Sequence, residues 1–148
     1  MADYHSVSFN MRNQTIYTIG HSLTQIDEFI KTLRNNEIEV LVDVRTYPKS
    51  NRARQFNQES ISESLSKNKI QYLYRGNNLG GLGENIDFDD TIFEISQMAI
   101  NTRTVLMCSE GNPKKCHRYS ILTPAFEKQG LIVVHLVSMT NKPQISQF

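Results

Sequence analysis

Residues 40–44, Val-Leu-Val-Asp-Val, form an almost uninterrupted apolar run whose single polar side chain is that of Asp43. A strand with one face in water alternates apolar and polar residues, so a continuous apolar run indicates a strand covered on both faces. Such strands occur in parallel sheets, because the crossovers that join parallel strands place helices over both faces. This run therefore predicts an α/β fold.

Further strand-like and helical segments alternate along the rest of the chain. Strands are expected at residues 15–19, 71–74, 104–107 and 131–137, and helices at residues 26–33, 57–68, 92–99 and 117–129. This alternation is typical of βαβ units. We expect one three-layer α/β domain over residues 15–140, with a mostly parallel five-stranded sheet, an N-terminal tail at 1–14 and a C-terminal tail at 141–148. The glycine-rich stretch 75–88 is expected to be a loop.

The overall charge gives no preference for a nucleic acid or a membrane as partner. The 148 residues carry a formal net charge of +1, with 39% hydrophobic and 21% charged residues, as in ordinary globular proteins. The charge is nevertheless uneven, because basic residues dominate residues 45–75 and acidic ones residues 76–101. This asymmetry predicts either a polarised anion-binding face or two separately solvated surfaces.

The chain has no sequence feature of a membrane or secreted protein. No apolar run approaches the roughly 18 residues that cross a bilayer, and the N-terminal residues lack the apolar stretch of a secretory signal. We therefore expect a cytoplasmic protein with no membrane partner. In that compartment the two cysteines are expected to be reduced thiols rather than a structural disulfide.

Unusual polar and glycine residues follow four of the predicted strands. The carboxyl ends of parallel strands meet at one edge of the sheet, where α/β proteins bind their ligands. We expect one pocket there, with candidate site residues His21, Ser22, Asp43, Arg45, Gly80, Gly81, Cys108, Glu110, His117 and Arg118.

The residues after the first two strands also have structural interpretations. Ser22 can help to bind an anion at a helix N-terminus or can cap the helix, and His21 can face a ligand or serve the fold. Asp43 and Arg45 can contact a ligand or form a salt bridge that fixes the loop. For Ser22 we favour the capping role.

The sequence contains no established cofactor motif. The glycines at 80–83 lack the spacing of a dinucleotide fingerprint, so they predict a lid, a substrate wall or a flexible loop. A zinc site built from Cys108, Cys116 and His117 would need a fourth ligand, and none is evident. We expect no metal ion and no cofactor.

Cys108 and Glu110 are the candidate reactive groups after the fourth predicted strand. A thiol between a strand end and a helix start can be stabilised as a thiolate, but Cys is often buried, and we favour Cys108 as the last core residue of its strand. Glu110 can act as a general acid or base, or it can pair with Arg118 or Lys114.

His117 and Arg118 at a helix start oppose the helix dipole, which suggests contacts with a polar or anionic ligand.

Together these motifs resemble those of the domain of unknown function 488 family. The matching segments are residues 18–22, 41–45 with Pro48, 79–81, 107–110 and 116–118, within a resemblance from about Thr15 to about His135. The resemblance implies a small α/β domain with a polar pocket formed by these motifs, and it supplies no reaction. The loop from Cys108 also resembles the cysteine loop of rhodanese-like sulfurtransferases, although Pro113 stands where such loops often have Arg.

Three functional hypotheses follow from the sequence. The favoured one is an enzyme acting on a nucleotide, nucleobase or nucleic acid, with Glu110 and His21 or His117 as acid and base and with Arg45 and Arg118 as anion contacts. The second is a thiol-dependent enzyme, rhodanese-like or redox, that uses Cys108 with Cys116 as resolving partner. The third is a non-catalytic nucleic-acid-binding module, with basic residues Arg45, Lys49, Arg52 and Arg54 and nearby aromatic residues Tyr47, Phe56, Tyr72 and Tyr74.

Overall fold

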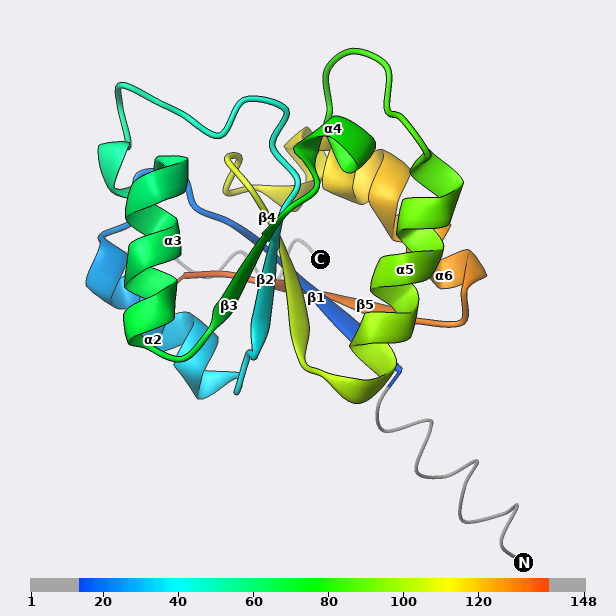
Figure 1. Cartoon of the computed structure of the whole chain (residues 1–148), viewed down its shortest axis with the longest axis horizontal. Helices are drawn as coiled ribbons and strands as arrows, with labels where there is room; N and C mark the ends of the chain where they lie inside the picture. The colour runs from blue at the N-terminus through cyan, green and yellow to red at the C-terminus, as the bar shows by residue number, and fades with distance from the viewer. Residues whose placement is uncertain (1–13, 139–148) are drawn as a thin grey trace, which may run out of the picture.

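The computed structural model describes residues 14–138, apart from the side chains of Arg118 and Tyr119. Its centre is a five-stranded sheet in the order β3-β2-β4-β1-β5 (Figure 1). The strands are β1 (Thr15–Gly20), β2 (Val40–Asp43), β3 (Gln71–Tyr74), β4 (Thr104–Cys108) and β5 (Ile132–Leu136). All four strand pairs are parallel, so the predicted sheet is confirmed.

Helices cover both faces of the sheet and make three layers (Figure 1). One face carries α2 (Ile26–Asn35) and α3 (Gln58–Lys67), and the other carries α5 (Phe88–Asn101) and α6 (Thr123–Lys128). Short segments join them: η1 (Arg54–Phe56), α4 (Gly76–Leu79), η2 (Pro113–Lys115) and the π-helical η3 (Arg118–Leu122). The predicted three-layer α/β fold is therefore confirmed.

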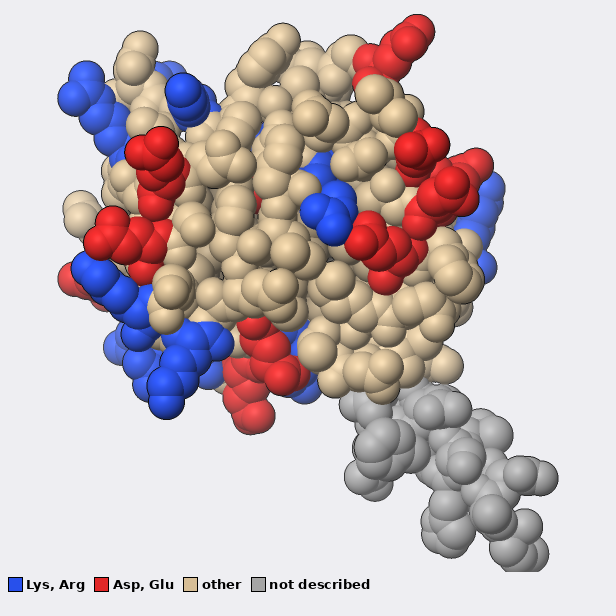
Figure 2. Space-filling view, viewed as in Figure 1, with Lys and Arg blue, Asp and Glu red and all other residues tan. Residues whose placement is uncertain are grey.

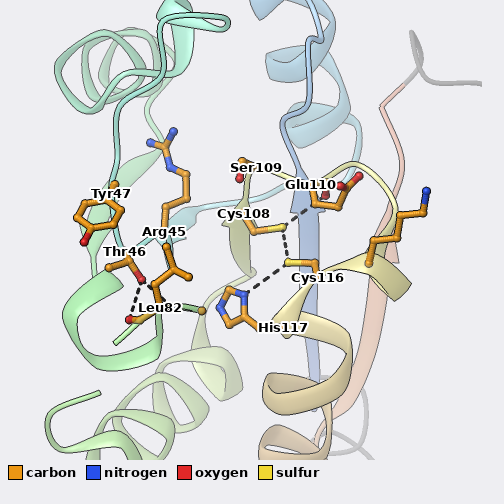
Figure 3. Close-up of a pocket in the computed structure, with 11 residues that line it drawn as sticks. Arg45, Thr46, Tyr47, Leu82, Cys108, Ser109, Glu110, Cys116 and His117 are labelled. Atoms are coloured by element: carbon orange, nitrogen blue, oxygen red, sulfur yellow. Dashed lines mark hydrogen bonds between the residues drawn. The ribbon is translucent and has the colours of Figure 1, made fainter. Parts of the chain in front are cut away.

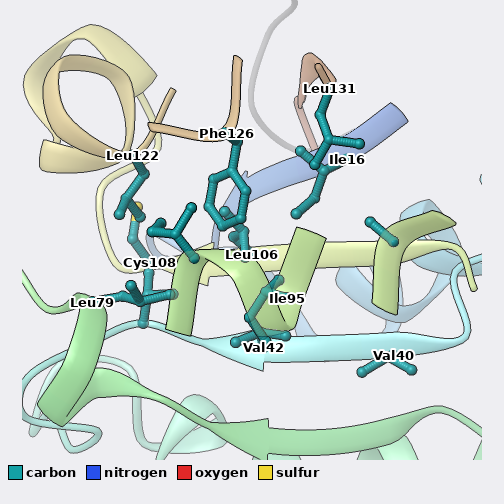
Figure 4. Close-up of a cluster of buried hydrophobic side chains, with 13 residues drawn as sticks. Ile16, Val40, Val42, Leu79, Ile95, Leu106, Cys108, Leu122, Phe126 and Leu131 are labelled. Carbon is teal, nitrogen blue, oxygen red and sulfur yellow. The ribbon is translucent and has the colours of Figure 1, made fainter. Parts of the chain in front are cut away.

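Strand β2 separates two apolar cores, as its continuous apolar sequence predicts. Leu41 belongs to the core under α2 and α3, whereas Val42 belongs to the core under α5 and α6, and both are 0% exposed. Figure 4 shows the second core, in which Ile95 of α5 and Phe126 of α6 lie over the sheet. Each face of β2 is thus buried by a helical layer, and the strand lies inside the sheet, paired with β3 and β4.

Strand β4 ends between the loops that follow β1 and β2. Those two loops lead to one face of the sheet, whereas the loop after β4 leads to the other face. Strand β4 lies between β1 and β2, whose chains continue into α2 and α3, whereas the chain after β4 continues into α6. Neighbouring connections that leave for opposite faces open a crevice beyond the carboxyl ends of the strands. The crevice at the end of β4 is where the fold has room for a ligand.

Two segments differ from the prediction. The expected loop 75–88 contains the short helix α4, and the expected helix 117–129 is divided into η3 and α6. Pro124 lies in the first turn of α6 and has no N–H to donate to a preceding turn, so the regular hydrogen-bond pattern cannot run through this point. The backbone before α6 is wider than that of an α-helix as a result.

The predicted tails fall almost wholly outside the described residues, so they stay predictions. Within residues 14–138, no helix has both the length and the apolar character needed to cross a membrane. The charge asymmetry of the sequence is visible in Figure 2, where acidic side chains gather over α5. Asp89, Asp90 and Glu94 of that helix are all exposed.

We predict that Gly20→Ala destabilises the fold more than Gly83→Ala does. A Cβ atom on Gly20 would lie 1.7 Å from the carbonyl oxygen of Glu110, a backbone atom that moves only if the β4 loop moves. Gly83 has φ +73° and open space around it, so alanine there costs only the left-handed strain of about 1 kcal/mol. Overpacking at Gly20 is expected to cost about 3 kcal/mol or more, measured by urea unfolding. Equal losses in the free energy of unfolding of the two variants would contradict the close approach of Gly20 to the Glu110 carbonyl.

Candidate functional site

A cavity of about 420 Å³ lies at the carboxyl edge of the sheet (Figure 3). It is lined by residues 45–47 after β2, 81–82 after α4, 108–110 at the end of β4 and 115–117 before η3. Segments far apart in the sequence therefore meet at one opening, as the parallel sheet predicts. Its volume is that of a site for a small molecule or a single side chain.

A buried ion pair lies beside the cavity at the end of β2, where Arg45 but not Asp43 is among the lining residues. The Asp43 carboxylate accepts hydrogen bonds from the Arg45 guanidinium at both oxygens, from Nε at 2.9 Å and from Nη2 at 2.8 Å. It also accepts one from the Arg45 backbone N–H at 3.1 Å and one from the Tyr72 hydroxyl at 2.6 Å. The side chains of Asp43 and Arg45 are 0% and 5% exposed. The salt-bridge interpretation of these two residues is therefore confirmed.

His21 is joined to this ion pair. Its Nε2 lies 3.3 Å from Nη1 of Arg45 and its Nδ1 lies 2.8 Å from the carbonyl oxygen of Ser22. A guanidinium can only donate and a carbonyl can only accept, so the ring is neutral with its hydrogen on Nδ1. The ring also stacks on Phe56 at 4.5 Å. Burial lowers the pKa of His21 to about 4, and the Arg45 charge adds to this effect.

The capping role favoured for Ser22 is wrong, because α2 begins at Ile26 with Gln25 as its N-cap and with no side-chain cap hydrogen bond. Ser22 instead belongs to the turn at the end of β1. It has φ 48°, and its N–H donates to the carbonyl oxygen of Ser109 at 2.9 Å. The preceding N–H of His21 donates likewise to Cys108, so the β1–β4 ladder continues past the strand ends. Neither His21 nor Ser22 is among the residues that line the cavity.

The glycine stretch forms one wall of the cavity. The Thr46 hydroxyl binds the backbone of Leu82, accepting from its N–H at 3.1 Å, and a Cβ atom on Gly80 would lie 2.1 Å from that hydroxyl oxygen. A Cβ atom on Gly81 would lie 2.9 Å from Nδ1 of His117. The loop thus packs against both Thr46 and His117, and side chains at 80 and 81 would separate these contacts.

Two thiols and an imidazole form a connected chain inside the cavity (Figure 3). Sγ of Cys116 lies 2.9 Å from Sγ of Cys108 and 3.6 Å from Nδ1 of His117. Nε2 of His117 lies 2.8 Å from the carbonyl oxygen of Leu79. Since that carbonyl only accepts, Nε2 carries a hydrogen and Nδ1 of the neutral ring is left to face the Cys116 thiol.

The two thiols differ in access to solvent. Cys108 is 3% exposed and belongs to the core under α5 and α6, so its predicted place as the last core residue of the strand is confirmed. Cys116 is partly exposed, and the two are thiols rather than a disulfide. Sγ of Cys108 lies 3.5 Å from the carbonyl oxygen of Glu110, to which it donates.

Glu110 lines the cavity with its side chain exposed. Its Oε1 accepts a hydrogen bond from the backbone N–H of Asn112 at 3.1 Å, which holds the turn after β4.

Arg118 is the first residue of η3, and its side chain is outside the described part of the structure, so its anion contact stays a prediction. Among the described residues, no group of three or more His, Cys, Asp or Glu side chains is arranged to hold a metal ion.

The structure adds site residues that the candidate set lacked. Cys116 was considered as a resolving partner and as one ligand of a rejected zinc site, and its contact with the His117 imidazole as a possible base was not foreseen. The sequence did contain a clue, because both cysteines lie in one strand-to-helix connection eight residues apart. No local sequence pattern indicated Tyr72 or the Leu79 carbonyl as parts of the site. Tyr72 binds Asp43, 29 residues away in the chain, and the Leu79 carbonyl binds His117, 38 residues away.

One comparison with known proteins found a match. The family model described as "Domain of unknown function DUF488" matches residues 25–88. Over these residues, 64 of the chain's 148, the chain is similar to this family. Searches of curated proteins and of solved structures found no match.

The stretch matched by the DUF488 model covers one half of the site. It contains the Asp43–Arg45 ion pair, Tyr72 and the glycine wall, whereas the segment that carries both thiols and His117 follows it in the chain. The family description gives no reaction, so the chemistry has to be argued from the side chains themselves.

We predict that His21 makes the fold sensitive to mild acid. The unfolded chain binds this proton with a pKa of 6.5 and the folded protein with a pKa of about 4. The unfolded state therefore binds more protons between these values, so stability is full above pH 6.5 and falls as the pH drops towards 4. Between pH 7 and pH 5 this group is expected to cost about 2 kcal/mol.

Urea unfolding at several pH values tests this prediction, with His21→Asn as the comparison. The variant has no imidazole to titrate, so its stability should fall less steeply between pH 7 and pH 5 than that of the wild type. Parallel curves would show that the His21 pKa is not lowered in the folded protein.

Proposed function

We propose that this protein is a thiol-dependent enzyme in which Cys116 is the nucleophile and His117 is its base. The observation that carries the proposal is the chain of contacts from Cys116 Sγ to His117 Nδ1 and from His117 Nε2 to the Leu79 carbonyl. A nucleophile beside a base that is itself oriented by a third group is the usual arrangement in covalent catalysis.

The contacts define where the proton goes. When Nδ1 of His117 takes the proton of the Cys116 thiol, the ring becomes an imidazolium with one N–H directed at the thiolate and the other at the Leu79 carbonyl. Both hydrogens then have acceptors, and the positive ring stabilises the adjacent thiolate. The reactive form of the sulfur is thereby favoured without a metal ion.

Access distinguishes Cys116 from Cys108 as the attacking group. The sequence hypothesis gave this role to Cys108, which is 3% exposed and packed in the core. Both thiols line the cavity, but Cys116 is the one that is partly exposed and that lies beside His117. A substrate entering the cavity therefore reaches Cys116 first, and this supports Cys116 as the nucleophile.

The mouth of the cavity is mainly apolar, with charges of both signs. Tyr47 is 72% exposed and Leu82 is 61% exposed, so the rim offers apolar surface to a ligand. Lys115 and Glu110 are both exposed at the same opening. Arg45 contributes little free charge, because its guanidinium is bonded to Asp43 and points away from the thiols (Figure 3).

Alkylation tests the proposal. Limiting iodoacetamide at pH 7 is expected to label Cys116 and not Cys108 in the folded protein, as read by peptide mass spectrometry. Substituting His117→Asn removes the base and should slow labelling about 10- to 100-fold. His135→Gln is the matched control, because His135 is in β5 and outside the cavity, and it should label at the wild-type rate.

Gly81→Ala gives an independent measure of the His117 position. The added methyl would crowd the imidazole and should lower the labelling rate while leaving Cys116 intact. Preferential labelling of Cys108, or equal rates in wild type and His117→Asn, would contradict the proposed roles.

A second candidate function is the nucleotide-directed enzyme favoured by the sequence, with Glu110 as acid or base and Arg45 and Arg118 as anion contacts. In its favour, Arg45, Glu110 and Lys115 line the same cavity. A guanidinium already paired to a buried carboxylate has less to offer a phosphate, which is why we rank this function below thiol chemistry. Likewise, exposed Lys49, Arg52 and Arg54 support nucleic-acid binding only through surface charge.

Titration calorimetry with AMP and with a single-stranded oligonucleotide, each at low and moderate salt, separates these candidates. We expect neither ligand to bind tightly, and Glu110→Gln to leave thiol labelling unchanged. Salt-dependent binding that is lost in Lys115→Gln would favour the nucleotide function instead.

A further inference from the structure

We propose that the substrate is a disulfide, which Cys116 attacks and which Cys108 then displaces from Cys116 by closing an internal Cys108–Cys116 bond. This inference rests on the proposed role of Cys116 as nucleophile. It adds the substrate class and gives the buried thiol a function of its own.

The two sulfur atoms lie close enough for a short movement to join them. Sγ of Cys108 and Sγ of Cys116 are 2.9 Å apart, against about 2.05 Å in a disulfide bond. A shift of less than the length of a bond therefore joins them. Both residues already pack in the same apolar core, Cys108 buried and Cys116 partly buried, so closing the bond exposes no new apolar surface.

The fold holds Cys108 in this position. Cys108 is the last residue of β4 and is paired with Gly20 of β1. The absence of a side chain at Gly20 lets the Glu110 carbonyl come close to the strand, and that carbonyl accepts the Cys108 S–H at 3.5 Å. The thiol is thus aimed out of the sheet towards Cys116, and it is poorly reached from solvent.

The exchange balances without any further reactant. The Cys116 thiolate, formed by proton transfer to His117, attacks one sulfur of R–S–S–R, forming Cys116–S–S–R and releasing one thiolate RS⁻. Cys108 then loses its proton and attacks the Cys116 sulfur, forming the internal disulfide and releasing the second RS⁻. The two released thiolates take up the two protons, so the protein loses two hydrogens and the substrate gains them. An external dithiol such as dithiothreitol returns the protein to its starting state.

The size and the rim of the cavity suit a disulfide. Groups flank the sulfur pair of a disulfide on both sides, and the cavity of about 420 Å³ with exposed Tyr47 and Leu82 at its rim offers room and apolar contact for them. A hydroperoxide would use a small part of that volume. Attack on an acyl substrate needs only one thiol, so it would not use the contact between Cys108 and Cys116.

The test uses 2-hydroxyethyl disulfide, a neutral probe that removes the influence of charge at the mouth. The chain holds only two cysteines, so intact-protein mass spectrometry identifies every product. Wild-type protein at pH 7 is expected to lose the mass of two hydrogens and to release two equivalents of 2-mercaptoethanol. Closure is intramolecular, so the mixed disulfide should not accumulate.

Single substitutions assign the roles. Cys108→Ala should stop after the first step and carry one stable 2-mercaptoethanol adduct on Cys116, with one equivalent released. Cys116→Ala should react at least about 100-fold more slowly. A circular dichroism spectrum and an unfolding curve for each variant confirm that it is folded, and dithiothreitol should restore the original mass of every product.

The possible failures are distinguishable. A stable single adduct on Cys116 of the wild type, or adducts on both cysteines, would overturn the resolving role of Cys108 and leave the proposed nucleophile in place. Wild-type protein that does not react, or that reacts no faster than Cys116→Ala, would overturn both proposals.

Discussion

The rest of the site depends on one buried carboxylate. Asp43 ends β2 with 0% exposure and accepts four hydrogen bonds, three from Arg45 and one from Tyr72 of β3. Through Arg45 the same network holds His21 after β1. A charge in a core persists only when its donors are all in place, and breaking such a pair costs about 3–5 kcal/mol. This requirement fixes the turn after β2, and hence the side of the cavity that Thr46 and Tyr47 form.

The thiol side of the cavity is fixed by topology and by close packing. Strand β4 ends between β1 and β2. Its loop therefore lies between the β1–α2 and β2–α3 connections, which lead to the other face of the sheet. The 3-10 turn η2, begun by Asn112 and Pro113, then reverses the chain and brings Cys116 back to Cys108. Gly81 lies against the His117 ring. The polar network thus supports the cavity, and the thiols and imidazole occupy it.

The fold could be predicted because its causes are local. The apolar run at β2 and the alternation of strand and helix periods are properties of short segments. The parallel sheet and the helical layers that they predict are confirmed by the structure. Among the elements that were missed, α4 depends on non-local contacts and the π-helical form of η3 on a proline inside a helical pattern, and the 3-10 turns η1 and η2 were not predicted either. A cavity does lie where the predicted strand ends converge, whereas the roles of its residues, which the three hypotheses assigned differently, stay predictions.

The sequence by itself determined which residues reach the carboxyl edge of the sheet, because that follows from where each strand ends. Only the tertiary structure decided which of them face one another. Arg45 turns inward to Asp43, His21 is held neutral beside it, and Cys116 meets both Cys108 and His117. The direction of a side chain in a loop depends on turns and packing partners distant in sequence, such as the carbonyl of Leu79, 38 residues before His117. No periodic pattern in the chain encodes those contacts.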